Sequence, residues 1–249
     1  MTLDGLQPAI LLPALAAGLL VLATHVPLGM EVLRRGIIFI DLAIAQIAGL
    51  GIVVASACGA EIGGWRTQVS AVAAALTGAL CLSWMEKKYP AQLEAVIGVS
   101  FVAAACTAIL LMSQDPHAGE HLKDLLVGQI LWTTWGGLAP LAGVTALTLV
   151  GWFGLRCNRS PLGFYLLFAI TITASVQVVG VYLVFASLIV PALAAGGRLV
   201  RAGAIGSAGY VLGLLASGLF DLPAGAAIVL ALVGVATLGG KAAATIEHR

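Results

Sequence analysis

The sequence predicts an all-α integral membrane protein, a single polytopic bundle of transmembrane helices that occupies residues 1–249. Of the 249 residues 61% are hydrophobic and only 9% are charged, and the mean hydropathy is +1.08. A soluble domain usually has roughly a quarter of its residues charged, so this composition is typical of a membrane protein. Apolar stretches of membrane-spanning length recur along the whole chain, separated by short breaks that hold most of the charges. Such stretches indicate helices, because a helix satisfies its own backbone hydrogen bonds in lipid.

We predict about eight to nine transmembrane helices and one additional short apolar segment. The first stretch has neither the basic start nor the short core of a cleavable signal peptide, so we expect it to remain as a helix. The additional segment, residues 125–135, is expected to form a re-entrant or periplasmic helix that does not cross the membrane. The helices are expected at residues 8–31, 37–57, 69–85, 93–112, 138–155, 163–179, 180–195, 203–220 and 223–240.

The run "GVYLVFASLIVP", between Gly180 and Pro191, is the shortest of these elements. It is too brief for an untilted span, which needs about 20 residues. Short and interrupted helices are common where transporters build a pathway, so this run is a candidate for such a place.

The distribution of basic residues predicts the orientation of the bundle. With the N-terminus outside, only Arg66 and Lys123 fall on the outer side. Lys and Arg concentrate in cytoplasmic loops, so we expect an outer N-terminus and a cytoplasmic C-terminus. The basic residues on the inner side are then Arg34, Arg35, Lys87, Lys88, Arg156, Arg159, Arg198, Arg201, Lys241 and Arg249.

Asp41 is the carboxylate inside the second predicted helix, and Gln46 follows it five residues later. Burying a carboxylate in hydrocarbon costs about 3 kcal/mol or more, so intramembrane carboxylates usually mark an ion or proton pathway. The alternative is that Asp41 pairs with Arg34 or Arg35 and anchors the helix. Asp41 and Gln46 both offer oxygen ligands, which suit hard or borderline cations. Gln177 is the other deep polar group, and we expect it to form an interhelical hydrogen bond.

The outer loop "SQDPHAGEHLKDLL", residues 113–126, is a second candidate metal contact. His117, Glu120 and His121 are its proposed ligands, and in a helix His117, His121 and Asp124 share a face at i, i+4 and i+7. Two other interpretations stay open. The Asp-Pro pair at 115–116 is typical of a helix start, and "HAGEH" fits the H-x-x-E-H metalloprotease pattern.

Several classes of function are excluded or disfavoured by what the sequence lacks. It contains no G-x-x-x-x-G-K-[ST] loop, so any energy from ATP must come from another chain. It contains no G-x-S-x-G motif, which argues against intramembrane hydrolase chemistry. The net charge of +1 gives no indication of nucleic-acid binding. We therefore expect a protein that is not itself an enzyme.

Three stretches together resemble the membrane permeases of bacterial ABC-type zinc, manganese and iron importers. The first is "PLGMEVLRRGIIFIDLAIAQIAGLG", residues 27–51, similar to that family's double-Arg turn and the Asp-and-His helix that follows it. The second combines "EAVIGVSFVAA" (94–104) with "LLVGQIL" (125–131), and the third is "SVQVVGVYLVFASLIVPALAA" (175–195). They occur in the family's order and cover nearly the whole chain.

The resemblance implies a homodimeric permease of the bacterial inner membrane with a fold like that of type II ABC importers. Its partners would be a pair of cytoplasmic ABC ATPase subunits, an extracytoplasmic metal-binding protein and membrane lipid. A divalent zinc, manganese or iron ion would be transported, with no permanently bound cofactor. Carried onto this sequence, the family's metal carboxylate is Asp41, and its imidazole position becomes Gln46.

This sequence departs from the family pattern in the second helix. The family places its acid and its histidine four residues apart, whereas Asp41 and Gln46 are five apart. Five residues rotate two side chains by roughly 140° on a regular helix, so they would not face one ion. A π-bulge absorbs one extra residue, and we predict one between Asp41 and Gln46.

A second departure lies in the loop that would dock to an ATPase. In place of the family's F-D-P-E-x-A segment, this chain has only "GLRCNRSPLG", residues 154–163. Either this short basic loop docks through Arg156, Asn158 and Arg159, or coupling to an ATPase is altered or lost. The alternatives to an importer permease are a stand-alone proton-coupled secondary transporter and a non-transport membrane assembly subunit.

Overall fold

The computed structural model describes residues 7–61, 63–113 and 128–247, and it consists of helices with no strand in this part of the chain. Three 3₁₀ turns, Pro90–Gln92, Ile130–Trp132 and Cys157–Arg159, and a π-helical segment, Val150–Gly154, connect or extend the longer helices. The α-helices are α1 (Pro8–Arg35), α2 (Ile40–Ala57), α3 (Trp65–Lys88), α4 (Leu93–Leu111), α6 (Leu138–Leu149), α7 (Pro161–Val179), α8 (Val181–Ala194), α9 (Leu199–Phe220) and α10 (Ala224–Glu247).

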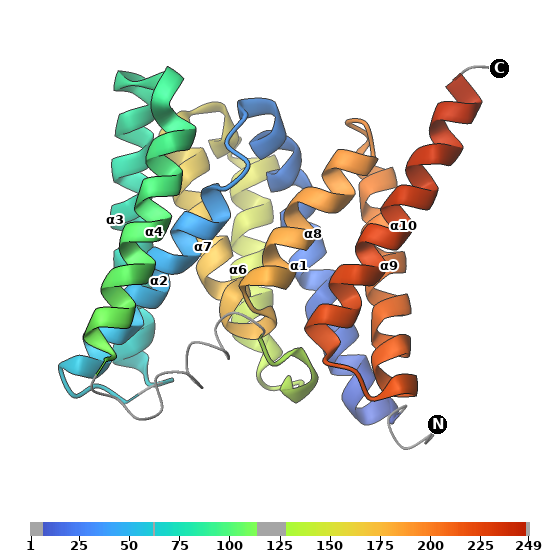
Figure 1. Cartoon of the computed structure of the whole chain (residues 1–249), viewed down its shortest axis with the longest axis horizontal. Helices are drawn as coiled ribbons and strands as arrows, with labels where there is room; N and C mark the ends of the chain where they lie inside the picture. Colours follow the sequence, from blue (N-terminus) through green and yellow to red (C-terminus); the bar gives the residue numbers. More distant parts are fainter. Residues whose placement is uncertain (1–6, 62, 114–127, 248–249) are drawn as a thin grey trace.

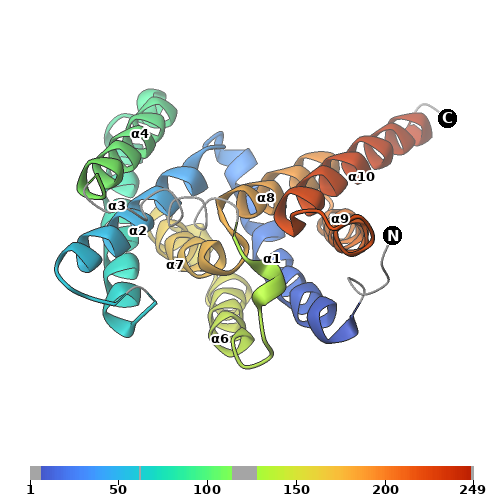
Figure 2. The same ribbon diagram turned by 60° about the horizontal axis from the view of Figure 1, so that its bottom comes forward.

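The helices form one bundle in which the chain runs back and forth between two ends (Figure 1). The start of α1 and the end of α10 lie at opposite ends of the bundle. The end of α4 and the start of α6 lie at the same end, which agrees with the prediction that the chain between them does not cross. Figure 2 shows α2, α3 and α4 grouped at one flank and α8, α9 and α10 at the other, with α1 and α7 between them.

Six of these helices are long and apolar enough to cross a membrane, and three shorter apolar helices complete the bundle within the described residues. The predicted fold class, an all-α polytopic bundle, is confirmed. The predicted span 69–85 is too short, since α3 runs from Trp65 to Lys88. The reason is that hydropathy falls where Arg66, Lys87 and Lys88 begin, whereas the backbone hydrogen bonds of the helix continue into these charged turns.

α1 lies at the centre of the bundle and packs against α8, α9 and α6. Its glycines allow close approach: a Cβ at Gly29 would collide with the backbone of Leu188 in α8, and one at Gly18 would collide with the Tyr210 ring of α9. Inside lipid the hydrophobic effect does not drive helix association, so close van der Waals packing at small residues stabilises these contacts instead.

The boundary between α7 and α8 is a true break at Gly180, as the short run in the sequence predicted. Gly180 has φ 80° and ψ 162°, a conformation that side-chain-bearing residues essentially do not adopt. Gly128 packs directly against this break, because a Cβ there would collide with the backbone of Val179 and Gly180. The segment that precedes α6 therefore packs directly against the break between α7 and α8.

Candidate functional site

Asp41 is the second residue of α2 and is buried, with 1% of its surface exposed. Neither carboxylate oxygen has a hydrogen-bond partner among the described residues. The first turn of a helix favours a carboxylate through the helix dipole, which offsets part of the cost of burial. Asp41 is therefore a buried acid that no side chain in the described part of the chain neutralises.

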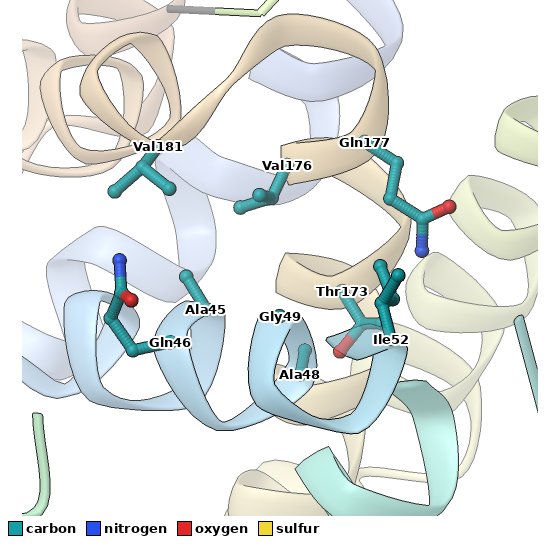
Figure 3. Close-up of a pocket in the computed structure, with 9 residues that line it drawn as sticks. All are labelled: Ala45, Gln46, Ala48, Gly49, Ile52, Thr173, Val176, Gln177 and Val181. Carbon is teal, nitrogen blue, oxygen red and sulfur yellow. The ribbon is translucent and has the colours of Figure 1, made fainter. Parts of the chain in front are cut away.

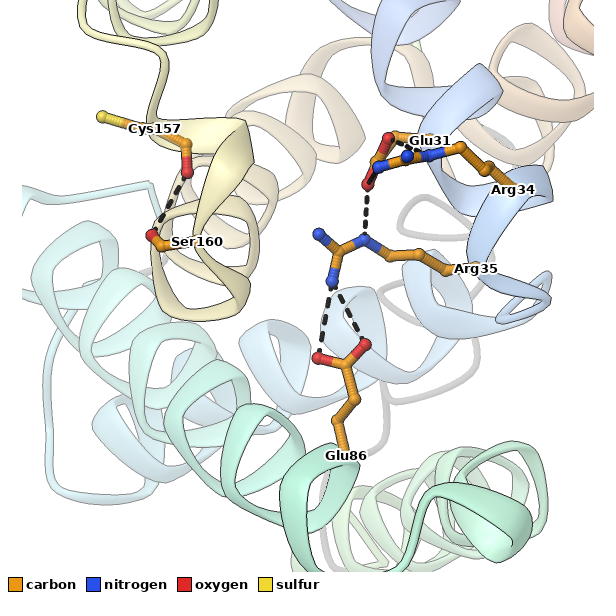
Figure 4. Close-up of polar contacts among 6 residues, drawn as sticks. All are labelled: Glu31, Arg34, Arg35, Glu86, Cys157 and Ser160. Carbon is orange, nitrogen blue, oxygen red and sulfur yellow. Dashed lines mark hydrogen bonds and ion pairs between the residues drawn. The ribbon is translucent and has the colours of Figure 1, made fainter.

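The neighbouring arginines do not pair with Asp41, so the anchoring alternative weighed from the sequence is wrong. Arg34 and Arg35 both donate to the buried Glu31, at 2.6 Å (Arg34 Nη2) and 2.7 Å (Arg35 Nε). Arg35 also donates through Nη1 to Glu86 of α3 at 3.1 Å (Figure 4). Its guanidinium lies 4.3 Å from the centre of the Phe164 ring at the start of α7. We call Glu31, Arg34, Arg35 and Glu86 the arginine cluster. It joins the ends of α1, α3 and α7.

α2 is a continuous α-helix from Ile40 to Ala57, so the predicted π-bulge between Asp41 and Gln46 is wrong. The run between the two residues is Leu-Ala-Ile-Ala, which contains no proline or glycine to interrupt the helical hydrogen bonds. Asp41 and Gln46 thus point roughly 140° apart around the helix and do not face one common ion. The π-helical segment lies instead at Val150–Gly154, next to the short basic loop.

Gln46 lines a small cavity between α2 and the end of α7, which we call the α2–α7 cavity (Figure 3). Its volume is about 20 Å³, which is room for one water or one bare ion. In Figure 3 the Gln46 amide projects from α2 on the side of Val181, and the Gln177 amide projects from α7 toward Ile52. The lining residues are Ala45, Gln46, Ala48, Gly49, Ile52, Thr173, Val176, Gln177 and Val181.

Asp41 lies one helical turn from this cavity, on the same face of α2. Ala45 and Ala48, which line the cavity, follow Asp41 at i+4 and i+7. Positions with this spacing lie one above the other on a helix. The carboxylate and the cavity are therefore successive features along one face of α2, even though Asp41 and Gln46 do not point the same way.

Sequence reasoning missed the contribution of Thr173 and expected a different role for Gln177. The Thr173 hydroxyl is buried and has no hydrogen-bond partner among the described residues. Gln177 makes no interhelical hydrogen bond in the described part of the chain; its amide lines the cavity instead. The available signal was the i, i+4 spacing of Thr173 and Gln177, which places both on one face of α7.

Glu94 of α4 is a further polar residue near the start of α2. Its Oε1 accepts a hydrogen bond from the backbone N–H of Phe39, the residue that precedes α2, at 3.4 Å. Its Oε2 is buried without a partner among the described residues. A second carboxylate thus contacts the residue that precedes the helix carrying Asp41.

The metal ligands predicted in the outer loop, residues 113–126, lie outside the part of the chain that the structure describes. His117, Glu120 and His121, like Asp124, lie outside the described residues. Within the described ranges no group of three or more His, Cys, Asp or Glu side chains is arranged to hold a metal ion. A cation site in the described part of the bundle would therefore have at most two such side chains and would depend largely on neutral oxygen donors.

The short loop of residues 154–163 is compact and exposed. Arg156 and Arg159 are exposed, while Asn158 is half-buried. Ser160 begins α7 by accepting a hydrogen bond from the Gly163 N–H at 3.0 Å, and its hydroxyl donates to the Cys157 carbonyl (Figure 4). Phe164 follows directly, in the first turn of α7, and its ring lies under the Arg35 guanidinium.

A comparison with known protein families decides what this bundle is. The model of the ABC 3 transport family matches residues 7–154 and 152–239. The chain belongs to the ABC 3 transport family. This membership confirms the resemblance to metal-importer permeases that the sequence suggested, and it makes the chain a multi-pass membrane subunit of an ABC transporter.

One curated relative of this ABC 3 protein is the manganese transport system membrane protein MntC of Halalkalibacterium halodurans. The two are 26% identical over 243 residues, which span 87% of this chain and 82% of the relative. The similarity thus extends over about four fifths of the relative and is not confined to one motif.

Two solved structures share the fold of this ABC 3 protein. PsaBC from Streptococcus pneumoniae, in complex with Fab, superposes with a TM-score of 0.67 at 20% identity, covering 93% of this chain and 89% of that one. An ABC transporter of the metal-chelate type in an inward-facing conformation superposes with a TM-score of 0.55 at 13% identity, covering 94% and 77%. At these identities the likeness concerns the fold alone.

Proposed function

We propose that this ABC 3 protein is the permease of an importer for a divalent metal ion, which is manganese, zinc or iron. The observation that carries the proposal is the buried, unpaired carboxylate of Asp41 in a chain of this family. The name of the curated relative, a manganese transport system membrane protein, supports the same class of cargo. The chain binds no nucleotide of its own, and ATP is hydrolysed in a separate subunit.

Asp41 acts in this proposal by holding the cation transiently. A carboxylate without a partner is costly in a membrane, and a passing cation removes that cost while it is bound. Because that cost returns when the ion leaves, the unpaired carboxylate favours binding of the cation, and release requires a change in the surroundings of Asp41. The Gln46 amide offers an oxygen further along α2, at the α2–α7 cavity rather than beside Asp41.

The basic residues at the two ends of the bundle indicate which end would face the ATPase and which would face the metal-binding protein. The end of α1, the end of α3 and the start of α7 lie at one end of the bundle, and the start of α3 lies at the other (Figure 1). Arg34, Lys87 and Arg156 stand at or beside the first three of these helix ends, and Arg66 stands at the start of α3. The positive-inside rule makes the first of these ends cytoplasmic, so the N-terminus is outside and the C-terminus inside. The ATPase pair docks there, on the loop of residues 154–163, and an extracytoplasmic metal-binding protein meets the opposite end of a homodimer.

Metal accumulation tests this proposal. Cells that express the chain with and without the candidate ATPase are loaded with manganese, zinc or iron, and cellular metal is measured by elemental analysis. We expect accumulation only when both chains are present. Accumulation that follows a proton gradient and ignores the ATPase would assign the chain to secondary transport, and no accumulation under any condition would overturn the importer function.

A further inference from the structure

The α2–α7 cavity is lined by polar side chains that have no hydrogen-bond partner among the described residues. The Thr173 hydroxyl is buried, lines the cavity and has no partner among the described residues. A buried hydroxyl without a hydrogen bond costs roughly 1–3 kcal/mol, so such groups usually have a ligand. The Gln46 and Gln177 amides line the same cavity and make no hydrogen bond with any other described residue. Three side chains thus offer free oxygens around a space of about 20 Å³.

The cavity also lies at the broken end of α7. No backbone N–H in the described residues is hydrogen bonded to the carbonyl oxygens of Gln177, Val178 or Val179, because the chain turns away at Gly180. Free carbonyls at the end of a helix carry partial negative charge and favour a cation. Val176 and Gln177, in this last turn of α7, line the cavity directly, whereas α8 contributes only Val181.

The donor chemistry limits which cation the cavity would prefer. Its polar groups are a hydroxyl and two amides, with no thiolate, imidazole or carboxylate among the lining residues. Oxygen donors suit hard cations such as manganese, whereas zinc gains more from nitrogen and sulfur donors. The negative charge that a divalent ion needs comes from Asp41, one turn away along the same face of α2.

We propose that the α2–α7 cavity is a second station for the transported ion, in which Thr173 and Gln177 are ligands that favour manganese over zinc. This proposal rests on the importer function proposed above. It extends the path of the ion from Asp41 along α2 to the break between α7 and α8. A cavity of this size accepts one dehydrated ion and excludes a metal chelate.

Direct binding tests the proposal without requiring transport. The purified full chain in detergent is titrated with Mn²⁺, and free Mn²⁺ is followed by its electron paramagnetic resonance signal. We expect the double variant Thr173→Val, Gln177→Leu to bind Mn²⁺ about tenfold more weakly than the wild type, the size of effect typical of groups that shape a metal site. Both substitutions nearly conserve side-chain volume, and Thr173→Val removes a hydroxyl that has no partner, so the variant should fold.

Thr171→Val is the matched control. Thr171 lies on α7 as well and is buried, but its hydroxyl is hydrogen bonded to Thr148 at 2.8 Å and does not line the cavity. We expect its Mn²⁺ affinity to equal that of the wild type. Equal affinities for the wild type and the double variant would overturn the proposal and leave a water-filled cavity as the account of these groups.

The metal preference is tested by the opposite change, Gln46→His. An imidazole in the cavity adds a nitrogen donor, so we expect Zn²⁺ to displace Mn²⁺ at a lower concentration than it does in the wild type. An unchanged Zn²⁺ competition curve would contradict the assignment of selectivity to this cavity. Failure of the importer function can be distinguished from failure of the second station. A wild type that binds Mn²⁺ but accumulates no metal in cells overturns the importer function. A double variant with normal binding and normal transport overturns only the second station.

Discussion

Arg35 at the end of α1 and Glu86 near the end of α3 form a half-buried ion pair, with 3.1 Å between Nη1 and Oε1. The same guanidinium donates to Glu31 through Nε, so two carboxylates share it. Arg35 also covers the Phe164 ring at the start of α7. Three helices that are far apart in the sequence therefore meet at one side chain.

Arg35→Lys should destabilise the bundle although it keeps the charge. A lysine ammonium is a point donor that cannot reproduce the forked contacts or lie flat on the ring. Each lost hydrogen bond to a charged group costs roughly 1.5–3 kcal/mol. We expect a lower thermal unfolding midpoint for the purified protein in detergent. Arg34→Lys is the control, because the Arg34 side chain is 73% exposed and exposed pairs contribute about 1 kcal/mol or less. Equal midpoints for the two variants would contradict a structural role of Arg35.

The native cysteines report the orientation of the chain. Cys58 ends α2 and is exposed at one end of the bundle, whereas Cys157 lies at the other end in the basic loop. In intact cells we expect a membrane-impermeant maleimide to label Cys58 and to spare Cys157 until the membrane is permeabilised. Cys58→Ser and Cys157→Ser identify the two labels. Labelling of Cys157 in intact cells, with Cys58 protected, would reverse the proposed orientation.

The loop of residues 154–163 should determine whether an ATPase binds. Replacing Arg156 and Arg159 with alanine removes the two exposed charges of the loop, and we expect the candidate ATPase to co-purify in several-fold lower yield. Arg66→Ala, at the opposite end of the bundle, is the control and should leave the yield unchanged. Undiminished co-purification of the double variant would mean that docking uses another surface.

Much of the fold could be predicted because membrane helices are read from hydropathy alone. The order of the helices and the break at Gly180 followed from apolar length and from one glycine in a short run. The burial of Asp41 was also predictable, since a lone carboxylate in an apolar stretch has to face the bundle interior.

The site was harder to predict because it depends on how helices are rotated against each other. The spacing of Asp41 and Gln46 suggested a bulge, but the alanine-rich run between them keeps α2 regular. The partners of Arg35 could not be read from the chain, since Glu86 is 51 residues away. The only sequence signal for Thr173 was its i, i+4 spacing from Gln177, and only the packing of the helices shows that its hydroxyl is unpaired among the described residues.

The central claim, that Asp41 carries the transported metal, is tested most directly by metal accumulation in cells expressing Asp41→Asn with the candidate ATPase. Asparagine keeps the shape and removes the charge, so we expect accumulation to fall to the level of cells without the permease while the protein stays folded in the membrane. Asp221→Asn is the matched control, because Asp221 is exposed at the end of α9 and its left-handed backbone, φ 52°, tolerates asparagine. Full accumulation in Asp41→Asn cells would contradict the account.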